Sequence, residues 1–255
     1  MPCFIDWKIK LRRNYKMDYA VDVKNVSKTF KIEKLRGISC LTKSSANKNL
    51  IALDDVSFQI QKGEVLSIIG LNGSGKTTLL RIIAGVYLPD KGSVQVNGTL
   101  SPLMQLGAGF QNDLNAQENI IMNGMLLGLS KNQIESKVDS VIEYAELEKF
   151  TKMLLKHYSS GMRARLAFAT AMQINPDVLL VDEILAVGDK DFRKKSYESF
   201  LSFKKNKKTI LHATHNLEKI PELSDRVLLL DKGKNVMIGK PDEVIKKYME
   251  LRKSN

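Results

Sequence analysis

GLNGSGKT, residues 70–77, decides the fold, because it matches the phosphate-binding loop pattern G-x-x-x-x-G-K-[ST] in full. In such a loop consecutive backbone N–H groups surround a phosphate chain, and glycines let the backbone approach the anion. The pattern predicts that Lys76 places a positive charge at the terminal phosphates and that the Thr77 hydroxyl holds Mg²⁺. The residues expected to bind nucleotide here are Gly70, Asn72, Gly73, Ser74, Gly75, Lys76, Thr77 and Thr78.

The residues on either side of the loop fit this interpretation. Before it, VLSII at 65–69 is apolar and β-branched, which is typical of a buried parallel strand. After it, residues 77–84 have helical composition, so the N-terminus of a helix would point at the phosphates. The order strand, loop, helix predicts an α/β core built around a nucleotide.

Composition limits the class of protein. The chain has 255 residues, 43% of them hydrophobic, and a net charge of +12. No apolar run approaches the roughly 20 residues of a membrane helix, and the N-terminus lacks the apolar segment of a secretory signal. We therefore expect a cytosolic protein, with Cys3 and Cys40 as unpaired thiols. The positive charge suits nucleic acid or an anionic membrane surface, and charge alone does not choose between them.

The chain divides into a short basic extension, residues 1–16, and one domain, residues 17–255. Met17 is a candidate start, and the alternative is a basic amphipathic arm at residues 1–16 that contacts lipid headgroups. A strand pattern begins after Met17. Residues 31–49 are polar and predict a loop insertion, residues 51–60 predict a strand, and residues 94–98 predict another after a turn at 89–92.

A helical block interrupts the strands. Residues 118–150 show helical spacing, with Ser130 as the expected N-cap of the second helix, and another helix follows Gly161. We therefore expect an inserted helical subdomain at about 112–174. Strands return at 178–181, 209–211 and 227–230, and residues 241–253 predict a charged amphipathic helix.

Two adjacent carboxylates end the apolar run DVLLVDE. In phosphate-loop proteins an Asp at the end of such a strand holds Mg²⁺, which assigns this role to Asp182. Glu183 is then well placed to polarise the attacking water. An acidic pair alone is a weak signal, but together with the phosphate-binding loop it predicts a hydrolytic site.

The string YSSGM, residues 158–162, lies between these two motifs and precedes a helix. Here the chain resembles the ATP-binding cassette superfamily, which has the signature LSGGQ at this place. The resemblance implies a P-loop NTPase of ABC type, with a RecA-like core, an antiparallel β-subdomain and the inserted helical subdomain. It also implies that Ser159, Ser160 and Gly161 bind the nucleotide of a second copy in a head-to-tail dimer, with ATP and Mg²⁺ as cofactors.

Other residues take roles from the same resemblance. Residues 186–189 fit the D-loop, ending at Asp189, and His215 fits the switch histidine that contacts the γ-phosphate; His157 and His212 match no motif. Phe30 is the candidate for stacking on adenine. For the glutamine that senses γ-phosphate and Mg²⁺, the spacing favours Gln105 and the local string Phe-Gln favours Gln111; Gln105 ranks first.

Within this superfamily the strings around residues 101–130, 158–169 and 182–189 are similar to the ATPase subunit of polysaccharide exporters, which move lipid-linked O-antigen, teichoic acid or capsule. That implies a membrane permease partner, a peripheral place on the cytoplasmic face of the membrane, an anionic membrane surface nearby, and no nucleic acid. Many O-antigen members carry a C-terminal glycan-binding sandwich, for which no sequence remains before Asn255. The alternatives are a drug or antibiotic exporter ATPase, a soluble ABC ATPase, and a binding module with an inactive site.

Overall fold

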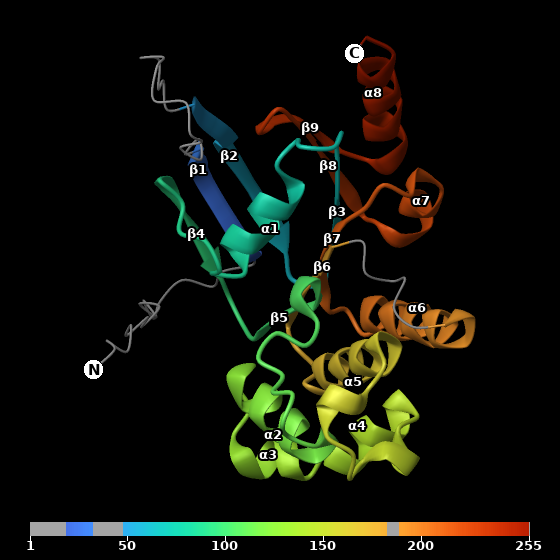
Figure 1. Cartoon of the computed structure of the whole chain (residues 1–255). Coiled ribbons are helices and arrows are strands. Elements are labelled where there is room, and N and C mark those ends of the chain that lie inside the picture. Colours follow the sequence, from blue (N-terminus) through green and yellow to red (C-terminus); the bar gives the residue numbers. More distant parts are fainter. Residues whose placement is uncertain (1–18, 33–47, 183–188, 255) are drawn as a thin grey trace, which may run out of the picture.

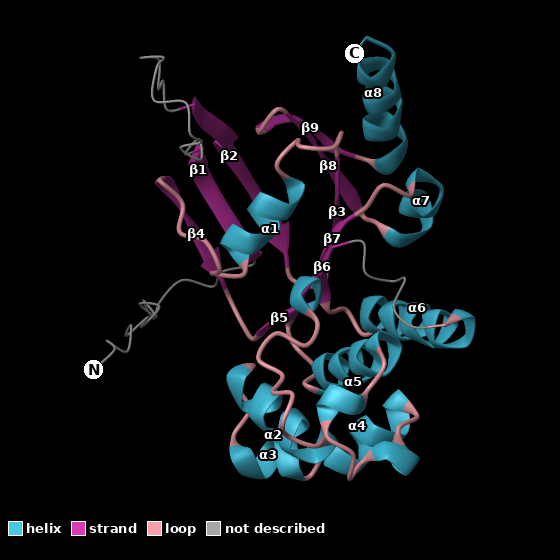
Figure 2. Ribbon diagram, in the orientation of Figure 1, coloured by secondary structure: helices cyan, strands magenta, loops and turns pink. Residues whose placement is uncertain are grey.

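The computed structural model describes residues 19–32, 48–182 and 189–254, and shows two sheets with helices around them (Figures 1 and 2). The larger, six-stranded sheet has the order β5-β6-β7-β3-β8-β9. Its strands are β3 (Val65–Ile69), β5 (Leu100–Pro102), β6 (Val178–Asp182), β7 (Thr209–Ala213), β8 (Arg226–Asp231) and β9 (Lys234–Gly239). Neighbouring strands are parallel except for the antiparallel pair β8 and β9. The carboxyl ends of β6, β7 and β3 therefore meet at one edge.

Alternating side chains of this sheet face two different cores. Leu66 and Ile68 of β3 pack in a cluster with α1 (Lys76–Ile83) and the smaller sheet. Val65 points to the opposite face, where it packs with Phe168 of α5 (Ser160–Gln173) and Phe192 of α6 (Lys190–Lys205). Because successive residues of a strand point to opposite faces, a largely apolar run such as 65–69 belongs to a strand buried on both sides.

The smaller sheet is antiparallel and three-stranded, with the order β2-β1-β4. It comprises β1 (Tyr19–Ile32), β2 (Lys48–Gln61) and β4 (Lys91–Val96). The expected loop at 31–49 is wrong at both ends, because Lys31 pairs with Asn49 and Ile32 with Lys48 in the β1–β2 ladder. Main-chain pairing, which is blind to side-chain polarity, extends the strands into polar sequence. The strand expected at 94–98 ends at Val96 and begins earlier, at Lys91.

The helical subdomain is formed by α2 (Ala116–Leu126), α3 (Lys131–Glu135), α4 (Val138–Ala145) and α5, all within residues 112–174. It has its own apolar cluster, which includes Ile120, Ile134 and Leu166. Ser130 caps α3 as expected, through a reciprocal capping box with Gln133.

The helical pattern expected from Ser130 to Phe150 is split. The Ser136 hydroxyl donates to the Gln133 carbonyl at 3.0 Å, and the N–H of Lys137 donates to the Ile134 carbonyl at 3.0 Å. Helix α3 therefore ends here, and α4 begins as a separate helix. A serine side chain that bonds to nearby backbone competes with helix propagation, which explains the break.

Two helices near the C-terminus pack against the larger sheet. Helix α7 (Ile220–Leu223) and helix α8 (Pro241–Ser254) cover β8, with Ile220 and Val244 buried against Val227 and Leu229. Helix α8 confirms the expected C-terminal helix. The sequence reasoning assigned no structure to β5, β9 or α6, whose residues form short or mixed patterns.

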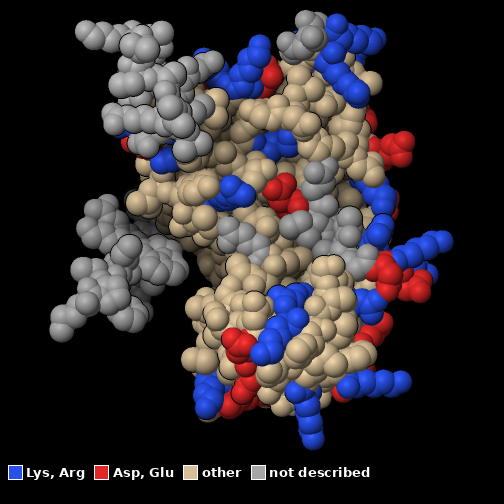
Figure 3. Space-filling model, viewed as in Figure 1, with Lys and Arg blue, Asp and Glu red and all other residues tan. Residues whose placement is uncertain are grey.

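Charged side chains lie on the surface of the described part of the chain. Figure 3 shows Lys and Arg side chains spread over the ends and one side of the molecule, with Asp and Glu among them. Within the described ranges no helix has both the length and the apolar character to cross a membrane.

One buried histidine predicts a pH dependence of stability. His212 on β7 lies against Phe200, with ring centroids 5.7 Å apart, and burial lowers its pKa from 6.5 to about 4. Between pH 6.5 and about pH 4, the histidine is protonated in the unfolded chain but stays neutral in the folded protein. The free energy of unfolding therefore falls as the pH drops through this range. The loss is about 3 kcal/mol in total.

Denaturant unfolding between pH 7 and pH 4 measures this effect. The variant His212→Leu removes the titrating group and should show a flatter dependence on pH than the wild type. If both proteins lose equal stability over this range, another group is responsible.

Candidate functional site

The phosphate-binding loop joins the carboxyl end of β3 to the N-terminus of α1. Helix α1 begins at Lys76 with Gly75 as its N-cap, in the left-handed region at φ 104°. The Lys76 ammonium is nearly buried and donates to the carbonyls of Gly70 at 2.8 Å and Leu71 at 3.1 Å. The positive charge of Lys76 and the N-terminus of α1 thus lie at the same place, which suits an anion.

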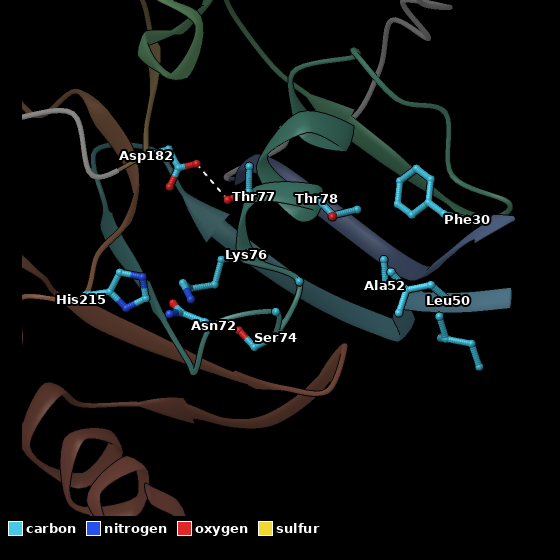
Figure 4. Close-up of a pocket in the computed structure, with 13 residues that line it drawn as sticks. Phe30, Leu50, Ala52, Asn72, Ser74, Lys76, Thr77, Thr78, Asp182 and His215 are labelled. Atoms are coloured by element: carbon cyan, nitrogen blue, oxygen red, sulfur yellow. Dashed lines mark hydrogen bonds between the residues drawn. The ribbon is translucent and has the colours of Figure 1, made fainter. Parts of the chain in front are cut away.

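A cavity of about 540 Å³ opens beside this loop. Ten of the residues predicted from the sequence line it: Phe30, Asn72, Gly73, Ser74, Gly75, Lys76, Thr77, Thr78, Asp182 and His215. Figure 4 shows Asp182 and His215 toward one end of the cavity and Phe30 with Leu50 toward the other. The cavity therefore has a charged end and an apolar end, as a nucleoside phosphate has.

The charged end offers oxygen ligands for a divalent cation. The Thr77 hydroxyl on α1 donates to Oδ2 of Asp182 at the end of β6, at 3.0 Å (Figure 4). Mg²⁺ prefers hard oxygen ligands and takes few from the protein, with the rest from phosphate and water. One hydroxyl and one carboxylate so close together, beside Lys76, fit that requirement.

His215 is exposed and follows β7, the neighbour of β6 and β3 in the sheet. Because these strands are adjacent and parallel, their carboxyl ends bring residues from three distant parts of the chain to one cavity. His212, the penultimate residue of β7, lies in the core instead. The sequence reasoning that separated these two histidines agrees with where they lie.

Phe30 at the apolar end is held by an aromatic neighbour. Its ring meets Tyr87 edge-on with centroids 5.5 Å apart, and the Lys28 ammonium lies 5.7 Å from the Phe30 ring centroid. Leu50 and Ile51 of β2 also line the cavity and are more than half exposed. Sequence reasoning assigned no role at the site to these two residues, although Ile51 begins the strand expected at 51–60 and Leu50 directly precedes it.

The signature segment, residues 158–162, does not line this cavity in the single chain. The Ser159 hydroxyl accepts from the N–H of Met162 at 3.2 Å and caps α5. Ser159 and Ser160 are exposed at the helix N-terminus, and Gly161 is partly exposed. The segment is thus available to a ligand that a second molecule holds.

Of the other predicted residues, Gln105, the alternative Gln111 and Asp189 lie in described segments, and several lie outside the described residues. Gln105 is the last residue of a short 3₁₀ helix, Leu103–Gln105, that follows β5. Gln111 is exposed, and its backbone N–H donates to Oδ1 of Asn119 on α2 at 2.7 Å. Asp189 is the N-cap of α6 and accepts from the N–H of Phe192 at 3.0 Å. Glu183, residues 186–188 of the expected D-loop, and residues 1–18 and 33–47 lie outside the described residues.

The loop geometry predicts an unequal effect of two glycine substitutions. Gly75 and Gly73 both have positive φ, 104° and 78°. A Cβ on Gly75 would lie 2.5 Å from the Ala52 carbonyl oxygen, whereas a Cβ on Gly73 meets nothing within 4 Å. Both alanine variants bear the backbone cost, and Gly75→Ala adds a clash worth about 1–3 kcal/mol.

Denaturant unfolding of Gly75→Ala and Gly73→Ala measures the difference, with Gly73→Ala as the matched control. Equal losses of stability in the two variants would show that β2 does not pack against the loop as described.

Fold and site together define a nucleotide-binding protein with a phosphate loop. The model of the ABC transporter family matches residues 53–186, just over half of the chain. The chain is 38% identical over 203 residues to the O-antigen export system ATP-binding protein RfbB of Klebsiella pneumoniae, covering 80% of this chain and 82% of the relative. It belongs to the ABC transporter family, as an ATP-binding subunit with the ATPase domain of that family.

Two longer relatives are also similar. RfbB of Myxococcus xanthus is 43% identical over 222 residues, covering 87% of this chain and 51% of the relative. The teichoic acids export ATP-binding protein TagH of Lactococcus lactis is 41% identical over 219 residues, covering 86% of this chain and 47% of the relative. The chain thus spans about half the length of these two proteins.

Solved structures confirm the fold class. A dimeric ATP-binding cassette in a post-hydrolysis state, bound to ADP and Pi, has a TM-score of 0.69 at 24% identity, covering 87% of this chain and 98% of that chain. The ATP-binding subunit of an ABC transporter has a TM-score of 0.70 at 23% identity, covering 90% and 93%.

Proposed function

We propose that this chain hydrolyses ATP to drive the export of a polysaccharide, lipid-linked as O-antigen or teichoic acid precursors are, through a membrane permease. The observation that carries the ATPase part is the meeting of Lys76, Thr77, Asp182 and His215 in one cavity at the carboxyl ends of three parallel strands. The exporter part rests on the similarity to RfbB and TagH.

Each residue at the cavity has a task in this reaction. The Lys76 ammonium and the loop N–H groups neutralise phosphate charge, and Phe30 stacks on the adenine. Thr77 and Asp182, together with Gln105, would hold Mg²⁺, and the bound ion would supply positive charge to neutralise the phosphates. His215 contacts the terminal phosphate, and Glu183 orients and deprotonates the attacking water.

The signature segment completes the site from a second copy. Because Ser159–Gly161 of one chain lie away from its own cavity, they are proposed to bind the nucleotide of the partner in a head-to-tail dimer. Asp189 closes the proposed D-loop at the same interface. Closure of the dimer would then move the permease. In this proposal the ATPase lies on the cytoplasmic face of a membrane with an anionic surface, and nucleic acid is not a partner.

Export is tested in the organism that encodes the chain. Removing the gene should abolish surface polysaccharide, and the wild-type gene should restore it while a gene encoding Asp182→Asn should not. Susceptibility to drugs measured in parallel distinguishes the rival exporter class. Normal surface polysaccharide together with a gain in drug susceptibility would reject glycan export and leave the ATPase assignment intact.

A further inference from the structure

Four charged side chains meet where α4, α5 and α6 come together. The Arg165 guanidinium on α5 contacts two carboxylates, Glu146 at 3.3 Å and Asp189 at close hydrogen-bonding range. The Lys195 ammonium on α6 lies 3.0 Å from the other oxygen of Glu146. We call these four residues the charge cluster. It lies across the boundary between the helical subdomain and the core, outside the nucleotide cavity.

An aromatic layer packs beside the charge cluster. The Phe168 and Phe192 rings lie edge to face with centroids 5.9 Å apart, and Tyr144 of α4 lies 6.0 Å from Phe192. Arg165 lies over Phe192, and Lys195 lies over Tyr144 at 4.6 Å. Apolar packing holds α4, α5 and α6 together, whereas the directional ion pairs select one orientation among them.

The charge cluster joins two segments that matter for the proposed reaction. Arg165 lies on the helix whose N-terminus carries Ser159–Gly161. Asp189 begins α6, and in the sequence it follows directly on the segment that leaves β6 after Asp182. Both oxygens of Asp189 are engaged within the chain, one by the N–H of Phe192 and the other by Arg165. These bonds and the Arg165 charge hold the pKa of Asp189 below its usual value, despite the opposing desolvation.

We propose that Arg165 is a positioning residue for the proposed ATPase: it sets the signature helix relative to the N-terminus of α6, and Asp189 acts through Arg165 instead of binding nucleotide itself. This inference rests on the proposed function and gives Asp189 a different role from the one the sequence suggested. Exposed ion pairs add little to stability, and Asp189 and Glu146 are both more than half exposed, so the role is geometric.

Arginine is required for this role because its planar fork reaches two carboxylates at once. A lysine keeps the charge but presents a single ammonium. Arg165→Lys should therefore behave like Arg165→Gln in turnover. Asp189→Asn removes the ion pair and keeps the helix cap, since asparagine caps as well as aspartate.

A double-mutant cycle tests the inference. Arg165→Gln and Asp189→Asn should each lower kcat by about tenfold or more with KM for ATP unchanged, because small misplacements of reacting groups are costly. The double variant should be no slower than the slower single variant, since both changes break one interaction. If the two effects multiply to about a hundredfold, Asp189 acts independently of Arg165 and the inference is overturned.

The control is Arg163→Gln, two residues upstream on the same helix. Arg163 donates to Asn112 at 2.8 Å, within the helical subdomain, and its loss should leave kcat at the wild-type value. Wild-type kcat in both Arg165→Gln and Arg165→Lys would overturn the inference.

Amide hydrogen exchange tests the positioning without any turnover. In the isolated chain, Arg165→Gln should speed exchange at the first turns of both α5 and α6, and Arg163→Gln should not affect α6. Unchanged exchange at α6 would overturn the inference. An inactive wild-type chain with the expected exchange would instead reject the proposed function and support the positioning role.

Discussion

Replacing Lys76 with methionine is expected to lower ATP hydrolysis by about 10²–10³-fold, the usual cost of one removed charge-stabilising donor. Lys76 is 7% exposed, and its ammonium donates to the carbonyls of Gly70 and Leu71 in the phosphate loop. Methionine keeps an unbranched stem of similar length and removes the charge. Steady-state hydrolysis and nucleotide affinity of the purified variant measure the loss.

Lys62→Met is the matched control, because Lys62 is an exposed lysine outside the cavity. It should hydrolyse ATP at the wild-type rate. Because Lys76 also donates to two loop carbonyls, its replacement can lower stability as well as remove the charge. Denaturant unfolding of both variants distinguishes these two effects. Activity of Lys76→Met within tenfold of wild type would remove Lys76 from its proposed place at the phosphates.

Replacing Glu183 with glutamine should reduce hydrolysis by about 10²–10⁴-fold, the range typical of a missing general base, while ATP binding persists. The amide retains the size of the side chain and cannot accept the proton of the attacking water. Because nucleotide held at two composite sites joins two chains, the variant should accumulate as an ATP-bound dimer.

Size-exclusion chromatography with and without ATP measures this dimer, and phosphate release measures turnover. Glu135→Gln serves as the control, since Glu135 is an exposed carboxylate on α3 that pairs with Lys131. A variant at position 183 that turns over like the wild type would show that another group activates the water.

Much of the site could be predicted from the sequence, because its motifs are short and local. The phosphate loop needs only a strand, a glycine turn and a helix, so residues 65–84 contain all that is required to recognise it. Asp182 and His215 each end or follow an apolar strand, and their convergence follows from the rule that parallel strands present their carboxyl ends at one edge. Both residues line the same cavity in the structure.

Other features depended on contacts between distant segments. Leu50 and Ile51 reach the cavity because they pair with Phe30 and Thr29 of β1, and this pairing joins segments that lie far apart in the sequence. The break between α3 and α4 depends on one serine hydroxyl, although the apolar spacing runs through it. The ion pairs of Arg165 join residues 19 and 24 positions away, which no helical or strand period relates.

The sequence by itself determined the class of fold, the phosphate loop and the identity of the residues at the charged end of the cavity, because each is encoded in a local pattern. The tertiary structure alone decided the apolar end of the cavity, the separation of the signature segment from it, and the engagement of Asp189 by Arg165. These depend on how sheets and helices pack, and packing brings together residues that no local pattern connects.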